Sequence, residues 1–229
     1  MSKLVEVSNL HKTYPGGSKV AALKGIDLVI TRGEFTALAG PSGSGKSTLL
    51  NMIGTLDRPT KGTVSYDGHV VSSLGADPLS DFRLRSLGFV FQAYNLIPVL
   101  TAVENVEYPL VLQGMDAAER RKLAQEALAW VGLEAYAERR PDLLSGGQQQ
   151  RVAVARAIVT RPSLVLADEP TANLDSKTGA QLLDLMQGLN KDHGITFLFS
   201  SHDGAVLERA RRVVRLQDGE LKSDEARPR

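Results

Sequence analysis

The segment GPSGSGKST, residues 40 to 48, has the residue types and spacing of a phosphate-binding loop. An apolar run, FTALA, precedes it and a helix-like run, STLLNMI, follows it, which is the context that the G-x-x-x-x-G-K-[ST] pattern requires. Glycines let the backbone curl so that amide groups face an anion, and the start of a helix adds a positive dipole end. We therefore expect the phosphates of a nucleotide to be held by Gly40, Pro41, Ser42, Gly43, Ser44, Gly45, Lys46, Ser47 and Thr48.

Three side chains of this loop are expected to have separate roles. Lys46 reaches the β- and γ-phosphates, the Ser47 hydroxyl binds Mg²⁺, and Thr48 donates to the α-phosphate. A flexible Gly-Ser linker is the alternative interpretation. We give it little weight because a linker has no reason to place Lys-Ser at the opening of a helix.

A carboxylate pair follows a second apolar run, in SLVLADEP at residues 163 to 170. Asp168 ends the predicted strand and can hold the shell of Mg²⁺. Glu169 then lies where a water would attack the γ-phosphate in line, which makes it the candidate base. A solvated strand end is the ordinary interpretation of an Asp-Glu pair, but the phosphate loop in the same chain favours catalysis.

These two motifs alone also fit small-molecule kinases and GTPases. A GTPase should carry Asn-Lys-x-Asp after a strand. Asn190-Lys191 is followed directly by Asp192, one place too early, so the sequence does not support recognition of guanine.

The segment LSGGQ at residues 144 to 148, followed by QQRVAVARA, resembles the signature motif of the ATP-binding cassette (ABC) ATPases. The other motifs of that family are present in the expected order, before and after LSGGQ, over nearly the whole chain. They are the aromatic that stacks on adenine at Tyr14, the glutamine after a strand at Gln92, the loop Asn173-Leu174-Asp175 and the switch histidine at His202. The resemblance implies an ATPase that couples ATP hydrolysis to transport, with ATP and Mg²⁺ as cofactors. The LSGGQ motif also argues against a nucleotide kinase.

Ser145 with the glycine pair after it forms a second glycine-rich turn opening a helix, hence a second anion site. The resemblance implies that this site serves the ATP of a second copy, so that two chains pack head to tail around two ATP molecules. Without that symmetry, LSGGQ would be a helix cap and nothing more. The residues expected to contact ATP in trans are Ser145, Gly146, Gly147, Gln148 and Asp175.

The resemblance also assigns His202 and Gln92 to catalysis. His202, after GITFLFSS, is expected to position the water and the γ-phosphate rather than act as the base. Gln92 is expected to touch Mg²⁺ or water and to report the nucleotide state to a helical insertion. The alternative for His202 is an ordinary surface histidine, and the alternative for Tyr14 is a tyrosine packed on a sheet. The Pro15-Gly16-Gly17 turn after Tyr14 favours adenine stacking.

Three longer stretches resemble one subgroup, the ATPases of lipoprotein-release, macrolide-export and cell-division type transporters. They are LLNMIGTLDRPTKGTV at 49 to 64, FQAYNLIPVLTAVENVEYPL at 91 to 110 and LADEPTANLDSKTG at 166 to 179, where Ala172 replaces the usual glycine. The resemblance implies export or lipoprotein extraction and an integral membrane permease subunit as partner. Our hypothesis is that residues Tyr94 to Leu100 form the groove that accepts a coupling helix of that partner.

The elements that must position these residues follow from the hydrophobic pattern. Short apolar runs dominate the first third, whereas Leu123, Ala127, Leu128 and Val131 recur at helical spacing. Further helices are expected after Ser145 and over 177 to 190, strands over 164 to 167 and 195 to 200, and a hairpin of Val213–Leu216 with Glu220–Leu221 around Asp218-Gly219.

The expected fold class is therefore α/β. The resemblance implies a P-loop NTPase with a RecA-like parallel core, an antiparallel β subdomain and a helical insertion subdomain. We expect one nucleotide-binding domain over residues 1–229, with its core in 1–92 and 151–224, its helical subdomain in 93–150 and a mobile tail in 223–229.

Composition bears on partners and location. The chain has 27 Lys and Arg against 26 Asp and Glu, so we expect no nucleic-acid partner. The uncharged stretch from Ser86 to Val103 contains polar residues such as Gln92, so we interpret the chain as soluble. MSKLVEVSNL lacks the apolar core of an export signal. With the resemblance, this predicts a cytoplasmic protein, peripheral on the cytoplasmic face of the inner membrane.

The competing class is a soluble ABC ATPase acting on nucleic acid or ribosomes. Such proteins usually carry two cassettes, coiled-coil insertions, zinc modules or basic arms, none of which is visible in the sequence. The arginine cluster near the end is interpreted as a solvated face or a contact to the membrane surface. Its members are Arg209, Arg211, Arg212 and Arg215.

Overall fold

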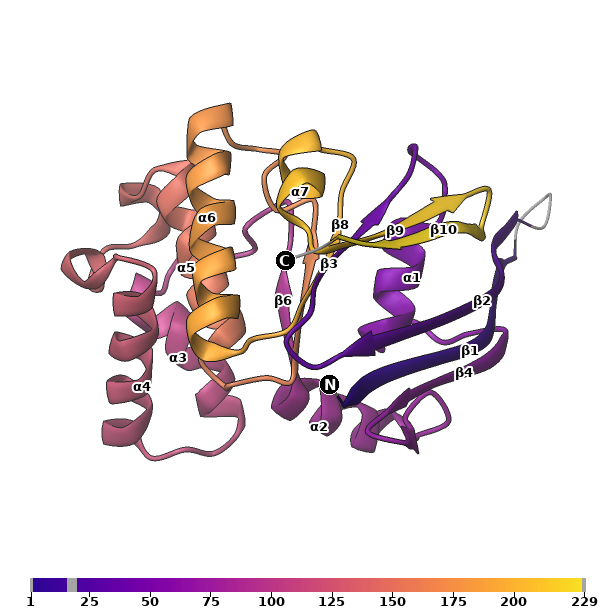
Figure 1. The fold of residues 1–229 in the computed structure, drawn as a ribbon. Helices are drawn as coiled ribbons and strands as arrows, with labels where there is room; N and C mark the ends of the chain where they lie inside the picture. The colour runs from indigo at the N-terminus through magenta and orange to yellow at the C-terminus, as the bar shows by residue number, and fades with distance from the viewer. Residues whose placement is uncertain (1, 16–19, 228–229) are drawn as a thin grey trace. The chain divides into compact units, whose positions relative to one another are not determined.

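A computed structural model describes residues 2–15 and 20–227 of the chain (Figure 1). These residues form two compact units. We call the first the P-loop unit, comprising Met1–Arg83 and Thr196–Arg229, and the second the signature unit, comprising Leu84–Ile195. The expected α/β class is confirmed, because parallel and antiparallel strands occur together with helices.

The P-loop unit contains an antiparallel sheet with the strand order β2-β1-β4-β5 among the described residues. Its strands β1 (Lys3–Tyr14) and β2 (Val20–Thr31) are longer than the apolar runs in the sequence indicate. They pair along almost their whole length, with several register shifts, so even the polar residues near Tyr14 belong to the ladder. The partners on the other side are β4 (Lys61–Tyr66) and β5 (His69–Val70).

A second set of strands in the P-loop unit is centred on β3 (Phe35–Ala39). All five residues of β3 are buried, as expected for a strand with parallel neighbours on both sides. Those neighbours are β8 (Phe197–Ser200) and β9 (Arg212–Gln217). The helices of this unit are α1 (Lys46–Ile53), α2 (Ala76–Ser86) and α7 (Gly204–Arg209).

The predicted hairpin near the end of the chain is confirmed. β9 pairs with β10 (Glu220–Ala226) through Asp218 and Gly219, whose φ values of 52° and 79° fit a tight turn with two left-handed residues. β10 continues to Ala226, which pairs with Arg212. The expected mobile tail from Ser223 is therefore wrong for residues 223–226, while residues 228 and 229 lie outside the described part.

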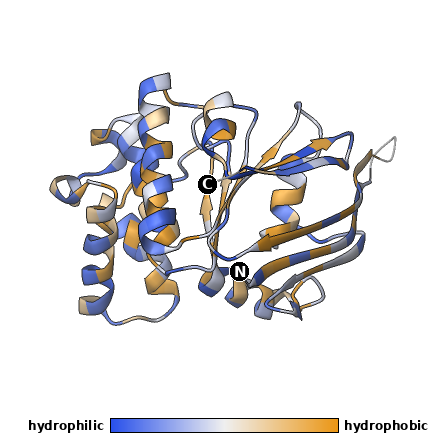
Figure 2. Cartoon of the chain, in the orientation of Figure 1, coloured by the Kyte–Doolittle hydropathy of each residue, from blue (hydrophilic) through white to orange (hydrophobic). Residues whose placement is uncertain are grey.

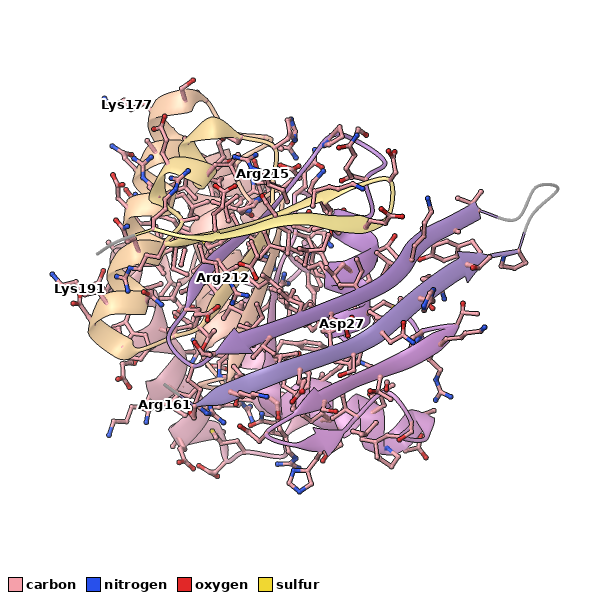
Figure 3. The ribbon with its side chains drawn as sticks, turned by 45° about the vertical axis from the view of Figure 1, so that its right-hand side comes forward. Asp27, Arg161, Lys177, Lys191, Arg212 and Arg215 are labelled. Carbon is pink, nitrogen blue, oxygen red and sulfur yellow. The ribbon has the colours of Figure 1, made fainter. Side chains whose placement is uncertain are left out.

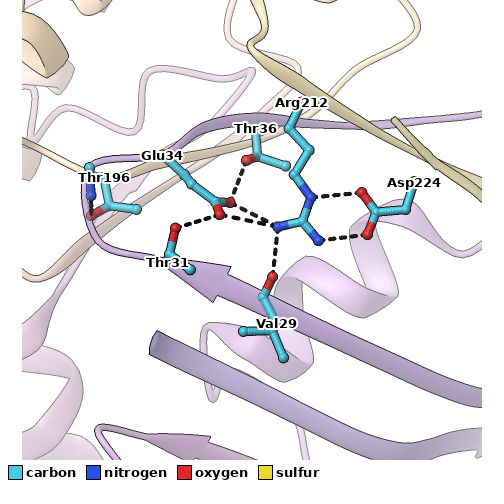
Figure 4. Close-up of polar contacts among 8 residues, drawn as sticks. Val29, Thr31, Glu34, Thr36, Thr196, Arg212 and Asp224 are labelled. Carbon is cyan, nitrogen blue, oxygen red and sulfur yellow. Dashed lines mark hydrogen bonds and ion pairs between the residues drawn. The ribbon is translucent and has the colours of Figure 1, made fainter. Parts of the chain in front are cut away.

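The arginine cluster does not form one solvated face. Arg212 and Arg215 point to opposite sides of β9 (Figure 3). Arg212 donates to Val29 O at 2.7 Å, lies 3.0 Å from Glu34 Oε2 and pairs with Asp224 Oδ2 at 2.6 Å (Figure 4). The interpretation as a solvated or membrane-facing group is wrong for Arg212, whose side chain is only 18% exposed. Long side chains three apart on a strand face opposite ways, so sequence proximity misleads here.

The signature unit combines two parallel strands, β6 (Leu87–Val90) and β7 (Leu164–Asp168), with four α-helices among its residues. The helices are α3 (Ala102–Leu112), α4 (Ala117–Trp130), α5 (Gly146–Ile158) and α6 (Ser176–His193). Short 3₁₀ turns over Glu134–Tyr136 and Pro141–Leu143 lead from α4 to α5. The predicted helical subdomain, 93–150, lies inside this unit.

Hydrophobic faces explain the packing inside the signature unit. Figure 2 shows hydrophilic and hydrophobic residues side by side along α6, the pattern of a helix with one buried face. α3 is joined to α4 by the nearly buried Glu107, which pairs with Arg121 Nε at 2.6 Å and Arg120 Nε at 3.4 Å.

No helix within residues 2–15 and 20–227 is long and apolar enough to cross a membrane.

Candidate nucleotide site

The phosphate loop connects the end of β3 to the start of α1 inside the P-loop unit. Gly40, Gly43 and Gly45 adopt φ values of 151°, 78° and 102°. Residues other than glycine rarely adopt such backbone angles. A Cβ on Gly40 would lie 2.2 Å from Leu216 O, so β9 approaches the loop too closely for any side chain. The β9–β10 turn supports the loop as well, because Gly219 N donates to Ser44 O at 3.1 Å.

Lys46 spans the phosphate loop. Its side chain is nearly buried, and Nζ donates to Gly40 O at 2.8 Å and Pro41 O at 3.0 Å. A cation is thereby held at the loop by its own carbonyl groups. Gly45, which precedes α1, has no side chain that could cap the helix, so the first-turn amides are offered to an external acceptor.

The donor set of this loop fits a phosphate group. Ser44 Oγ is buried and makes no hydrogen bond within the described part of the chain. Ser47 is exposed and Thr48 half-buried, both in the first turn of α1. The positive end of α1, the ammonium group of Lys46 and the loop hydroxyls therefore lie within one short segment, as the sequence predicts.

Tyr14 is held by two charged neighbours of the same unit. Its hydroxyl donates to Asp57 Oδ2 at 3.0 Å, and Lys12 Nζ lies 2.7 Å from Asp57 Oδ1 and 4.8 Å from the centre of the tyrosine ring. Partial burial and the hydrogen bond to Asp57 raise the pKa of Tyr14, while a hydrogen bond with Thr48 opposes the rise. Tyr14 is thus tied to the phosphate-loop helix. The glycines of the predicted turn, 16 and 17, lie outside the described residues.

His202 directly follows the buried end of β8. It is exposed, and its neighbour Ser201 is fixed by a hydrogen bond from its amide to Leu38 O at 3.1 Å. Asp203 caps α7 by accepting from Ala205 N at 2.9 Å. The histidine is therefore presented on a rigid corner beside the strand that leads into the phosphate loop.

The signature unit holds the two carboxylates at the end of β7. Asp168 is the last residue of that strand, and Glu169 follows it with a φ of 46°. Left-handed backbone costs free energy for a non-glycine residue, and such strain concentrates at functional sites. The turn is closed by Ala172 N donating to Glu169 O at 3.2 Å.

Gln92 and Asn173 contact each other. Asn173 Nδ2 donates to Gln92 O at 3.0 Å, and Gln92 Nε2 lies 3.4 Å from Asn173 Oδ1. Two segments that are far apart in sequence, one after β6 and one after Glu169, therefore lie side by side in the signature unit.

The signature turn starts α5 with a reciprocal cap. Gln148 N donates to Ser145 Oγ at 3.3 Å, and Ser145 N donates to Gln148 Oε1 at 2.9 Å. The expected helix cap is therefore present. A Cβ on Gly146 would lie 2.7 Å from the Tyr94 hydroxyl. A side chain at this position would therefore require the Tyr94 hydroxyl to shift.

Asp175 has a local role that its motif does not reveal. It begins α6 as the N-cap and accepts from Lys177 N, Thr178 N and Thr178 Oγ1, the last at 2.6 Å. The hydrogen bonds from Thr178 lower the pKa of Asp175 below its ordinary value. The carboxylate is therefore ionised and fixed at the start of the helix.

Comparison with known proteins identifies the family. The family model described as ABC transporter matches residues 23–172, which include the phosphate loop, the signature turn and both carboxylates. The chain belongs to the ABC transporter family. The ATP-binding domains of this family are ATPases, so the expected enzyme class is confirmed.

The ABC relatives agree over nearly the whole chain. The lipoprotein-releasing system ATP-binding protein LolD of Geobacter metallireducens is 46% identical over 225 residues, covering 98% of this chain and 100% of that protein. The macrolide export ATP-binding/permease protein MacB of Syntrophobacter fumaroxidans is 46% identical over 224 residues, covering 96% of this chain but 31% of that longer protein.

A solved ABC cassette confirms the fold. The dimeric post-hydrolysis structure of the cassette MJ0796, bound to ADP and Pi, matches with a TM-score of 0.90 at 46% identity. The match covers 99% of this chain and 100% of that one. MJ0796 is a protein of Methanocaldococcus jannaschii. The P-loop NTPase fold expected from the sequence is thus the fold of this ABC ATPase.

Two residues beside the site were not singled out from the sequence. Asp57 lies in the DRPTKG segment, where it looks like an ordinary turn residue, and only its contact with Tyr14 reveals its place. Gln150 is one of three consecutive glutamines, so residue type alone does not distinguish it. It is fully buried, whereas Gln148 and Gln149 are half-buried. Helical periodicity could have indicated which glutamine of the run faces inward.

Proposed function

We propose that two copies of this ABC ATPase bind two ATP molecules head to tail and drive a separate membrane subunit. The observation that carries the proposal is the presence of two glycine-rich helix starts in one chain, at Lys46 and at Gly146. The first is a complete phosphate cradle, so the second is available to the nucleotide of another copy. The dimeric state of the related MJ0796 cassette supports this arrangement.

In each site the chain's own residues have distinct roles. Lys46 binds the β- and γ-phosphates, the first-turn amides of α1 surround them, and Tyr14 stacks on the adenine. Ser145 and Gly147 of the second copy bind the γ-phosphate from the opposite side. Ser47, Gln92 and Asp168 would hold Mg²⁺, which would supply positive charge to neutralise the phosphates.

Hydrolysis requires a positioned water and a base. Glu169 accepts the proton of the attacking water, and His202 orients the water and the γ-phosphate. Closure of the dimer is favoured by charge-assisted contacts to the γ-phosphate and is lost when that phosphate leaves. The two nucleotide states therefore select two arrangements of the dimer.

The membrane partner binds at the segment from Tyr94 to Leu100. In this stretch Val99 is 71% exposed, and the other side chains are exposed or half-buried. Exposed apolar residues of this kind suit a coupling helix of a permease subunit. The chain would then lie at the cytoplasmic face of the inner membrane. The LolD and MacB relatives support export or lipoprotein release as the transported process.

The catalytic part is tested by Glu169→Gln. We expect ATP-dependent dimers to persist in light scattering while ATP turnover falls about 10²- to 10⁴-fold, because an amide cannot accept the proton. Glu208→Gln, at an exposed position, serves as the matched control and should hydrolyse ATP normally. Undiminished turnover in Glu169→Gln would overturn the assignment.

The transport part is tested by co-purification from membranes. An integral membrane protein should be recovered with the wild type and with Val70→Asp, but less with Val99→Asp, since both valines are exposed and only one lies in the proposed contact. Recovery of nucleic acid or ribosomes instead of a membrane protein would contradict the proposal.

A further inference from the structure

Gln150 joins the helix of the signature turn to both catalytic segments of the same unit. It lies five residues after Ser145 in α5 and is 0% exposed. Its Nε2 donates to Phe91 O at 3.2 Å and to Pro170 O at 2.7 Å. Phe91 precedes Gln92 and Pro170 follows Glu169, so one side chain holds the backbone next to each catalytic residue.

The chemistry of this contact requires an amide donor. Two carbonyl oxygens approach the same NH₂ group, which has two protons to give. A carboxylate would face both carbonyls with negative charge, and an apolar side chain would leave both unpaired in the interior. Gln150 Oε1 is itself buried without a hydrogen-bond partner in the described part of the chain. Burial of this oxygen costs free energy, so the two hydrogen bonds that Nε2 donates are made despite that cost.

Other contacts of α5 point to the same segment. Arg156, one and a half turns further along the helix, donates to Asn95 O at 2.6 Å and Tyr94 O at 3.0 Å. The Tyr94 hydroxyl lies against Gly146 at the start of the helix. The segment after Gln92 is therefore held by α5 from the signature turn to its last turns, and Gln150 extends this link to Pro170.

We propose that Gln150 is a positioning residue that sets Gln92 and Glu169 relative to the start of the signature helix. The effect of this positioning on ATP hydrolysis rests on the proposed function. Because the signature turn contacts the ATP of the second copy while Gln92 and Glu169 serve the chain's own ATP, Gln150 connects the two ATP sites of the dimer. Hydrolysis in one site thereby depends on occupancy of the other.

The test compares Gln150→Met, which keeps the length but removes both donors, with Asn190→Leu. Asn190 is also a buried amide of this unit, but it donates to Ile195 O beyond the far end of α6. In hydrogen–deuterium exchange of the full chain without nucleotide, we expect Gln150→Met to speed exchange of amides 91–95 and 171–174 about tenfold or more. Asn190→Leu should leave both segments unchanged.

Kinetics give the second readout. Gln150→Met should lower kcat about 10- to 100-fold, with the affinity for a fluorescent ADP analogue within about twofold, because the phosphate loop is untouched. The dependence of rate on ATP concentration should also lose its cooperativity. Gln150→Glu should behave like Gln150→Met. Asn190→Leu should keep the wild-type kcat at a temperature well below its Tm.

Unchanged exchange in both segments, or a kcat of Gln150→Met within about twofold of the wild type, would overturn the proposal. Glu169→Gln is measured in parallel. If it hydrolyses ATP at the wild-type rate, the proposed function fails, while the exchange result still decides the link through Gln150. If neither Gln150 variant folds, NMR of the wild-type side-chain amide decides: two protected protons support the link and fast exchange refutes it.

Discussion

The hydroxyl of Tyr14 donates a 3.0 Å hydrogen bond to Asp57, whose other carboxylate oxygen lies 2.7 Å from Lys12 Nζ. Burial by itself would raise the pKa of Asp57, but the hydrogen bonds from Lys12, the Arg58 amide and Tyr14 lower it overall. An ionised carboxylate therefore fixes the tyrosine ring at the edge of the P-loop unit. A ring held in advance loses less freedom when a base stacks on it.

Removing the Tyr14 ring should weaken ATP binding more than removing its hydroxyl. Stacking of one base on an aromatic side chain is worth about 1–3 kcal/mol, so Tyr14→Ala should raise the Kd for ATP about 5- to 150-fold. Tyr14→Phe keeps the ring and should change the Kd less than about fivefold. Isothermal titration calorimetry measures both. Equal effects of the two substitutions would argue against stacking.

Gly147 and Thr178 should form a coupled pair. A Cβ on Gly147 would lie 2.4 Å from Thr178 Cγ2, so Gly147→Ala should destabilise the fold by about 1–3 kcal/mol. Thr178→Ser removes that methyl group but keeps the hydroxyl that bonds Asp175, so the double variant should lose less than the sum of the single variants.

Gly188→Ala is the matched control for that pair. This glycine lies inside α6 with nothing within 4 Å of an added Cβ, so alanine should stabilise the helix by up to about 1 kcal/mol. Thermal denaturation followed by circular dichroism gives all four values. Additive losses in the double variant would mean that the clash is relieved in another way.

Arg212→Met should destabilise the P-loop unit strongly. The guanidinium lies between Glu34 and Asp224, and its loss removes the ion pair of Glu34, whose side chain is 16% exposed, with Arg212. Breaking a fully buried ion pair from one side costs about 3–5 kcal/mol, and because Arg212 and Glu34 are partly exposed we expect about 2–3 kcal/mol. For a chain of 229 residues this lowers Tm by about 4–12 °C.

Two further variants define the cause. Adding Glu34→Gln to Arg212→Met should recover part of the loss, because the remaining group is then neutral. Arg215→Met, at an exposed position on the other side of β9, should shift Tm by no more than about 2 °C. A large loss in Arg215→Met would show that general charge, not the buried pair, is responsible.

Glu104 makes part of the stability depend on acid pH. Its carboxylate accepts from the Thr101 amide at 2.7 Å in the capping box of α3, and this hydrogen bond lowers the pKa of Glu104. A lowered pKa in the fold stabilises it above the unfolded value of about 4.3, and the contribution disappears as pH falls through the folded value.

Glu104→Gln should therefore reduce Tm near neutral pH and match the wild type at low pH. An acidic group in the first turn of a helix contributes about 0.3–1 kcal/mol, or roughly 1–4 °C for a chain of this size. Thermal melts between pH 7 and pH 3 provide the measurement. A difference that grows as the pH falls would contradict this sign.

The motifs could be predicted from the sequence, because each depends on residues close together in the chain. Phosphate loop, signature turn and hairpin need glycines, a lysine or a capping serine at fixed short spacings, and local backbone rules are enough to predict them. The amphipathic helices were predictable for the same reason. Their ends, and the length of β1 and β10, depend on pairing partners and were not.

Contacts between side chains far apart in the chain could not be predicted and are known from the folded structure. Asp57 reaches Tyr14 across 43 positions, and Gln150 reaches Phe91 across 59. Arg212 lies in a partly buried network rather than with the arginines beside it, because strand pairing brings Glu34 and Asp224 to its face of β9. Hydrogen bonds and ion pairs between distant segments depend on packing, which no local pattern in the chain encodes.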